Sequence, residues 1–128
     1  MVLEHIRLSN QAKDHLIRLK TKTGIKQWNI LSRWAFCLSI AEPSIPPKAD
    51  IPTDSNVEMS WRVFGGQHDG IYEALLKERC KRDGLGSSPE VLSDQFKLHL
   101  HRGIGYLYGD KSVNNIANLL KKITSNEG

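Results

Sequence analysis

The sequence lacks any apolar stretch long enough to cross a bilayer, and its first residues, Met1 to His5, do not resemble a secretory signal. A membrane span needs about 18 or more consecutive apolar residues, and a signal joins a charged start to a long apolar stretch. We therefore expect no membrane association and a cytoplasmic location. Cysteine is also scarce. Cys37 and Cys80 match no metal-binding spacing and fall within apolar helical patterns, so we expect both to be reduced core residues.

Groups of residues that would support catalysis are missing as well. The first 42 residues contain only three acids, Glu4, Asp14 and Glu42, which argues against two-metal cleavage of a phosphodiester beside the basic part of the chain. No serine or cysteine stands in a recognisable nucleophile context. The sequence thus predicts no catalytic residues and no cofactor.

Histidines and glycines could suggest sites, but their spacing argues otherwise. His99 and His101 are two apart in a predicted helix, so their side chains point about 200° from each other and cannot share one metal ion. A composite metal site with His68 and Asp69 is the alternative, and we favour no metal site. The glycines of the segment 102–109 lack phosphate-loop spacing. We predict that they allow close helix packing: Gly103, Gly105 and Gly109.

What the sequence does contain begins with a strand and two helices. Leu3 to Leu8 alternates apolar and polar residues, as expected of a strand with one buried face. Ser9 is suited to cap a helix over residues 10–22, and Gly24 is suited to end it. Residues 25–41 then form a second helix, apolar around most of its circumference, which predicts that it is buried against another copy of itself or an equivalent helix.

The same order of elements returns after a proline-rich linker, residues 43–56. Alternation over residues 57–63 predicts a strand. Helical spacing of apolar residues over 71–82 predicts a helix with five inward residues. Ser88 and Pro89 begin a further helix. A last amphipathic helix is predicted after Ser112, with apolar positions Val113, Ile116, Ala117, Leu120 and Ile123. The inward residues of the helix over 71–82 are Ile71, Tyr72, Leu75, Leu76 and Cys80.

These elements predict a mainly α fold: one small helical domain over residues 1–128 with a short β-ribbon, similar to ribbon-helix-helix proteins. Its parts are a strand-helix-helix unit (1–42), the linker (43–56), and a second unit with the last helix (57–124). A single strand needs a partner for its backbone groups. The two halves therefore either pair their strands within one chain or exchange them with another chain, and we expect an oligomer.

Positive charge is concentrated in the first unit. The whole chain carries a net charge of +4. Residues 1–42 contain seven Lys or Arg against three acids, whereas residues 57–109 contain seven of each. An ordinary solvated lysine face is the alternative to a binding surface. If the surface binds DNA, lysine favours phosphate contact over base readout, and the candidate residues are Arg7, Lys13, Arg18, Lys20, Lys22 and Lys26.

With these residues in view, the chain resembles the DndE family of the bacterial DNA phosphorothioation machinery. The resemblance rests on the joint order of four segments: Ile6 to Ser9 leading into the lysine-bearing helix, the tryptophan-containing second helix, Glu58 to Gly66, and His101 to Asp110. It implies an accessory protein in the replacement of a non-bridging phosphate oxygen of DNA by sulfur. The implied partners are double-stranded DNA, with nicked duplex preferred, and a sulfurtransferase, an ATPase and a cysteine desulfurase.

The resemblance also implies a homo-oligomer, a tetramer, that binds DNA through surface lysines. Two other functions remain open from the sequence. One is a metal-dependent nickase that opens the DNA backbone in the same pathway. The other is a scaffold that meets DNA only through its partner proteins.

Overall fold

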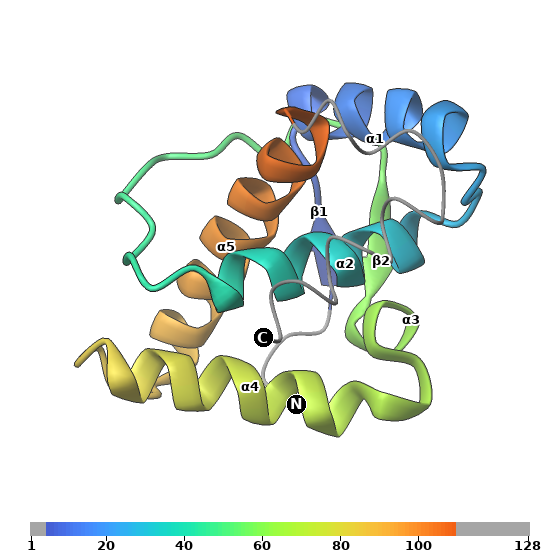
Figure 1. Cartoon of the computed structure of the whole chain (residues 1–128). Coiled ribbons are helices and arrows are strands. Elements are labelled where there is room, and N and C mark those ends of the chain that lie inside the picture. Colours follow the sequence, from blue (N-terminus) through green and yellow to red (C-terminus); the bar gives the residue numbers. More distant parts are fainter. Residues whose placement is uncertain (1–4, 110–128) are drawn as a thin grey trace.

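The computed structural model of the chain describes residues 5–109. Within them, helices pack against a two-stranded ribbon (Figure 1). None of these helices is both long and apolar enough to cross a membrane. In chain order the elements are β1 (His5–Arg7), α1 (Asn10–Thr23), α2 (Trp28–Ala41), β2 (Glu58–Ser60), α3 (Trp61–Gly65), the short 3-10 helix η1 (Gly66–His68), α4 (Asp69–Arg82) and α5 (Pro89–Gly109).

The strands predicted in the two halves pair with each other inside one chain. β1 and β2 are antiparallel, with Ile6 opposite Met59 and Arg7 opposite Glu58. The pairing is extended by the Leu8 amide, which donates to the Val57 carbonyl at 3.1 Å. Ile6 and Met59 are buried, so one face of the ribbon covers the core while the other faces out. The mainly α fold with a small ribbon is therefore confirmed.

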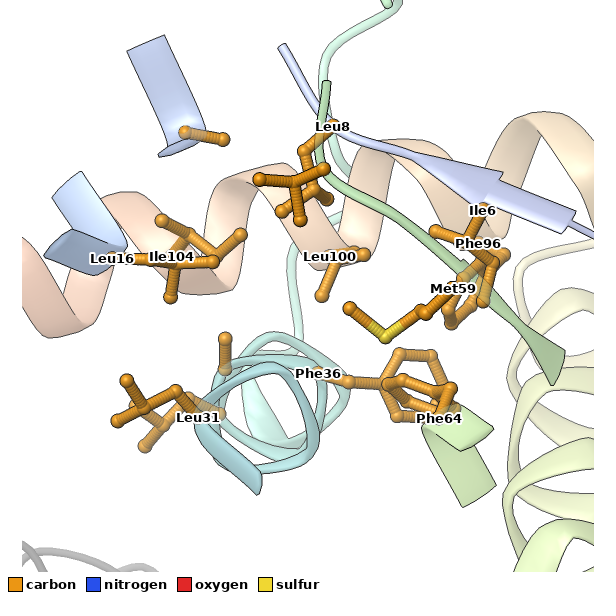
Figure 2. Packing of buried hydrophobic residues seen from close by; sticks show 14 of the residues in the cluster. Ile6, Leu8, Leu16, Leu31, Phe36, Met59, Phe64, Phe96, Leu100 and Ile104 are labelled. Atoms are coloured by element: carbon orange, nitrogen blue, oxygen red, sulfur yellow. The ribbon is translucent and has the colours of Figure 1, made fainter. Parts of the chain in front are cut away.

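The core lies where α2 crosses α5, underneath the ribbon (Figure 2). Leucines from α1 and α5 fill one end of it, and a cluster of aromatic rings fills the other. The rings of Phe36, Trp61, Phe64 and Phe96 contact one another with centroids 5.0 to 5.7 Å apart. All five of these pairs meet edge to face or tilted, and none is a face-to-face sandwich, which aromatic quadrupoles disfavour.

One glycine determines how closely α2 and α5 approach. A Cβ atom placed on Gly103 would lie 1.7 Å from the carbonyl oxygen of Ala35, so only glycine fits there. Among residues 5–109, no atom lies within 4 Å of a Cβ placed on Gly105 or Gly109. The predicted packing role is thus confirmed for Gly103 and wrong for the other two, because only Gly103 sits at the crossing point.

The end of α2 is held by a buried arginine. Arg79 of α4 is 1% exposed, and its guanidinium pairs with Asp83 at 2.8 Å. Its remaining donors reach main-chain oxygens where α2 ends and the linker begins. Helix ends leave such carbonyls without partners in the helix, and Arg79 satisfies them. The accepting carbonyls belong to Ile40, Glu42, Pro43 and Ser44.

The strand predicted over residues 57–63 is wrong in its second half. The strand ends at Ser60, whose Oγ accepts from the Val63 amide at 3.0 Å and so caps the short helix α3. Trp61 and Phe64 then point inward three residues apart, as on a helix. Val63, expected inward, is 51% exposed. The cap formed by Ser60 and the helical spacing of Trp61 and Phe64 decide the structure of this segment, although its residues alternate as in a strand.

Two of the inward positions predicted for the helix over residues 71–82 were also wrong, because Ile71 and Leu75 are exposed. The second helix begins at Trp28 instead of residue 25, and only its inner face is fully buried, against α5 of the same chain. Trp61 is a core residue, whereas Trp34 is half-buried. The helix predicted after Ser112 lies outside the described residues.

Replacing Gly103 should destabilise the protein strongly. Gly103→Ala places a methyl group on the Ala35 backbone, which cannot yield by side-chain rotation, and we expect a loss of ~3 kcal/mol or more in unfolding free energy. Gly105→Ala is the matched control in the same helix. It meets open space and should stabilise by about 0.5 to 1 kcal/mol. Urea denaturation of both variants measures this, and similar effects of the two changes would contradict the role of the crossing.

Acid should destabilise the crossing of α2 and α5 through His99, which lies on α5. This ring is fully buried, with Nδ1 2.8 Å from the Ser39 Oγ. Burial, reinforced by the charges of Arg79 and Arg102, lowers the pKa of His99 from 6.5 to about 4. A lowered pKa means that the folded state binds fewer protons than the unfolded state. The stabilising contribution is therefore complete above pH 6.5 and decreases as the pH falls towards 4.

Between those pH values His99 should account for a loss of at most roughly 3 kcal/mol in unfolding free energy. The measurement is urea denaturation at a series of pH values for the wild type and for His99→Asn, whose curve should be flatter in this window. Gln67→Asn, at an exposed position without a titratable side chain, is the control and should keep the wild-type slope. An unchanged slope in His99→Asn would refute the assignment.

Candidate nucleic-acid interface

The helix that carries most of the candidate residues is fixed at both ends. The Ser9 Oγ accepts from the Ala12 amide at 3.0 Å and caps α1, and Gly24 ends it in a left-handed conformation with φ 77°. Ala12, Leu16 and Leu19 are buried along its inner side. The predicted cap and end of this helix are confirmed, so its polar side is turned away from the core.

His101 of α5 locks the start of α1 in place. Its Nε2 accepts from the Ser9 amide at 3.2 Å, and its Nδ1 lies 2.8 Å from the Lys97 carbonyl, to which it donates. One nitrogen accepts while the other donates, which requires the neutral ring. Burial lowers the pKa of His101, in agreement with that form. His101 therefore serves the position of α1, and no cluster of three metal-binding side chains occurs within residues 5–109.

Arg7, on the outer face of the ribbon, is paired with an acid. Its guanidinium lies 2.6 Å from the Glu58 carboxylate directly opposite on β2 and donates to the Ser55 carbonyl at 3.2 Å. His5 also lies 3.5 Å from Glu58. The side chains of His5 and Arg7 thus both lie beside one carboxylate.

Three of the lysines rest on neutral groups. Lys13 donates to the Asn56 side-chain oxygen at 2.6 Å. The ammonium of Lys20 lies 3.4 Å from the ring centre of Trp28, a cation–π distance. The ammonium of Lys22 lies 5.7 Å from the ring centre of Tyr108. These contacts orient the side chains without cancelling their charge.

The six candidates do not form a single row. A helix turns about 100° per residue, so Lys13 and Lys20, seven apart, share one edge of α1, while Arg18 and Lys22 share the other. Their contacts agree, because Lys20 leans towards α2 and Lys22 towards α5. Arg18 and Lys26 are exposed and have no ion pair within residues 5–109. The result is a broad basic face across α1, with Arg7 at the ribbon end.

Sequence reasoning missed the partners of these cations. Trp28 is half-buried beneath Lys20, and Tyr108, near the end of α5, lies beside Lys22. Alternation in both strands could have suggested that Arg7 meets an acid, since Glu58 lies on the outward face of β2. The register that puts them opposite each other is visible only in the structure.

Comparison with known proteins gives this face a context. The family model described as DNA sulphur modification protein DndE matches residues 5–115 of the chain. The chain belongs to the DndE family. The resemblance seen in the sequence is therefore confirmed, and the match includes all six candidate residues.

Solved structures agree with this family. The crystal structure of DndE from Escherichia coli B7A, involved in DNA phosphorothioation modification, is similar with a TM-score of 0.69 and 26% identity, over 84% of this chain and 98% of that chain. A glycine-to-lysine double mutant of DndE involved in DNA phosphorothioation has a TM-score of 0.64 at 22% identity, with the same two coverages, 84% and 98%. No protein with a curated description shows significant sequence similarity to the chain. Members of the DndE family act in the sulphur modification of DNA, and this chain is one of them.

The pair of Arg7 and Glu58 should be weak enough to open. Both side chains are more than one third exposed, and exposed ion pairs contribute about 0.2 to 1 kcal/mol. We expect a double-mutant cycle with Arg7→Met and Glu58→Gln, followed by urea denaturation, to give a coupling energy in that range. A coupling well above it would mean that Arg7 is locked to β2 and unsuited to contact another molecule.

Proposed function

We propose that this DndE-family protein is a non-catalytic DNA-binding subunit of the bacterial phosphorothioation system, acting in the cytoplasm. The observation that carries the proposal is the basic face of α1 and β1. It displays Arg7, Lys13, Arg18, Lys20, Lys22 and Lys26, and Arg7 alone among them is paired with an acid within residues 5–109. A surface with an excess of positive charge suits a polyanion.

The chemistry of the face favours contact with the DNA backbone. Lysine offers a compact charge without the planar fork with which arginine reads guanine. Phosphate contacts position a protein on DNA but carry no direct sequence information. We therefore infer duplex binding with little sequence preference, and a preference for nicked duplex from the family resemblance.

Assembly would multiply these contacts. We infer a homo-oligomer, a tetramer, in which several basic faces act on one duplex, and association with the sulfurtransferase, ATPase and cysteine desulfurase of the pathway. Linked binding sites raise the overall affinity without any new type of contact. The sulfur chemistry is assigned to these partners.

Removing cations from this face should lower the salt dependence of DNA binding. Each neutralised phosphate contributes about −0.9 to the slope of log K against log salt on duplex DNA. We expect Arg18→Ala and Lys26→Ala, at exposed positions without an acid partner, to reduce that slope by roughly one each. Arg7→Ala should have a smaller effect, because a contact through Arg7 must first displace Glu58.

The control is Lys77→Ala. This lysine is held by Glu73 at 2.9 Å on α4, on the side of the molecule opposite α1 (Figure 1). Fluorescence anisotropy with intact and nicked duplex over a salt series measures all variants. Affinity and slope that are the same in every variant would defeat the proposal.

Two further assays separate the other functions. Conversion of supercoiled plasmid to open circles with Mg²⁺ or Mn²⁺ would indicate a nickase. Absence of DNA binding together with co-purification of the sulfurtransferase would indicate a scaffold.

A further inference from the structure

The strand β1 has one edge that β2 does not cover. The Leu8 amide donates to the Val57 carbonyl beside β2 at 3.1 Å. Backbone groups of successive strand residues point to opposite edges, so those of Ile6 also face β2, while those of His5 and Arg7 face away from it. No hydrogen bond between described residues occupies these outward amides and carbonyls. A free edge of this kind is a template for pairing with another chain.

A cleft of about 300 Å³ lies along this edge. Thr53 of the linker and β1 line one side of it, and α5 lines the other. Its buried base is apolar and consists of Ile6, Phe96 and Leu100. No residue of β2 lines the cleft, and Figure 1 shows α5 and β2 on opposite sides of β1. The cleft therefore opens along the edge at which the backbone groups have no partner.

The charged side chains that border the cleft are all positive. Arg7 and Lys97 are the two cations that line it, and none of the lining residues is an acid. Arg7 pairs with Glu58 on the outer face of the ribbon, whereas Lys97 has no ion pair within residues 5–109. Positive charge in a cleft without acids attracts an anionic group.

The free edge, the apolar base and the positive border together fit an extended peptide. A peptide that adds a strand to a sheet edge gains main-chain hydrogen bonds, while its alternate side chains enter pockets beside that edge. The volume of the cleft is at the lower limit for ligand sites, so it suits a few side chains. A DNA backbone has acceptor oxygens but no amide donors, so it cannot satisfy the carbonyl groups of His5 and Arg7.

We propose that an acidic, extended peptide segment of another protein pairs with the free edge of β1 and inserts an apolar side chain into the cleft between β1 and α5. The backbone groups of His5 and Arg7 form the hydrogen bonds of the added strand. Lys97 binds a carboxylate of the peptide. This surface is an addition to the proposed DNA-binding face and does not depend on it.

Selection from a displayed library of random octapeptides on the full-length protein, without DNA, tests the proposal. The selected peptides should alternate apolar and acidic residues. Lys97→Glu reverses a charge beside the cleft and should weaken the binding of a selected peptide by about tenfold or more, because like charges then face each other. Lys81→Glu makes the same change at an exposed position of α4 and should keep the wild-type affinity.

Methylation of the peptide backbone tests the strand pairing itself. N-methyl groups on alternate residues remove the amide donors from one edge of an extended peptide. The pattern that blocks the edge facing β1 should abolish binding, and the pattern shifted by one residue should preserve it. Fluorescence anisotropy with the labelled peptides measures both, and equal effects of the two patterns would contradict the pairing.

Three other results would overturn the proposal. One is a selection that enriches no peptide, and another is a selection that enriches basic peptides. The third is an unchanged peptide affinity in Lys97→Glu, which together with weaker duplex binding by this variant would assign the cleft to DNA. Because the selection contains no DNA, a failure of the proposed DNA binding would leave its outcome unchanged.

Discussion

The contact between Gly103 and Ala35 is the constraint on which the other parts of the structure depend. A side chain at position 103 would collide with the α2 backbone, so glycine alone permits the distance at which the two helices cross. One helical turn beyond this point, Ser39 meets His99. The aromatic cluster forms beside the same crossing, with Phe36 on α2 against Phe96 on α5. A wider crossing would leave these pairs without their partners.

Two arginine side chains hold the start of the linker against the end of α2 by hydrogen bonds. Arg79 and Arg102 donate to carbonyl oxygens around the end of α2, and both reach Ser44 at the start of the linker. At the other end of the linker, Ser55 donates to the Leu8 carbonyl through both its amide and its hydroxyl. The linker is thus fastened at each end, which brings β2 alongside β1 and sets Glu58 opposite Arg7. Buried carbonyl groups need such partners, since an unpaired one costs about as much as a lost hydrogen bond.

The sequence was informative where the signal is local and less so where it depends on tertiary geometry. Ser9 and Gly24 bound α1, and Pro89 begins α5, because capping and proline chemistry act within a few residues. The strand over residues 57–63 failed because a short alternation also fits a strand followed by a capped helix. Which glycine lies at the helix crossing, and which acid faces Arg7, depend on contacts between distant segments. No local pattern contains that information, so the sequence could name the basic residues but not the side chains that they contact.

The partners of the basic residues also decide how much of their charge is available. Arg7 forms an ion pair with Glu58. Lys13 instead donates to an amide oxygen, and the ammonium groups of Lys20 and Lys22 face aromatic rings. A neutral partner restricts a long side chain without reducing its charge, so less conformational entropy remains to be lost when an anion binds. Such contacts are weaker than ion pairs with a buried acid and open readily. The lysines of α1 therefore keep their charge while their side chains are oriented, which the same number of cations paired with acids would not achieve.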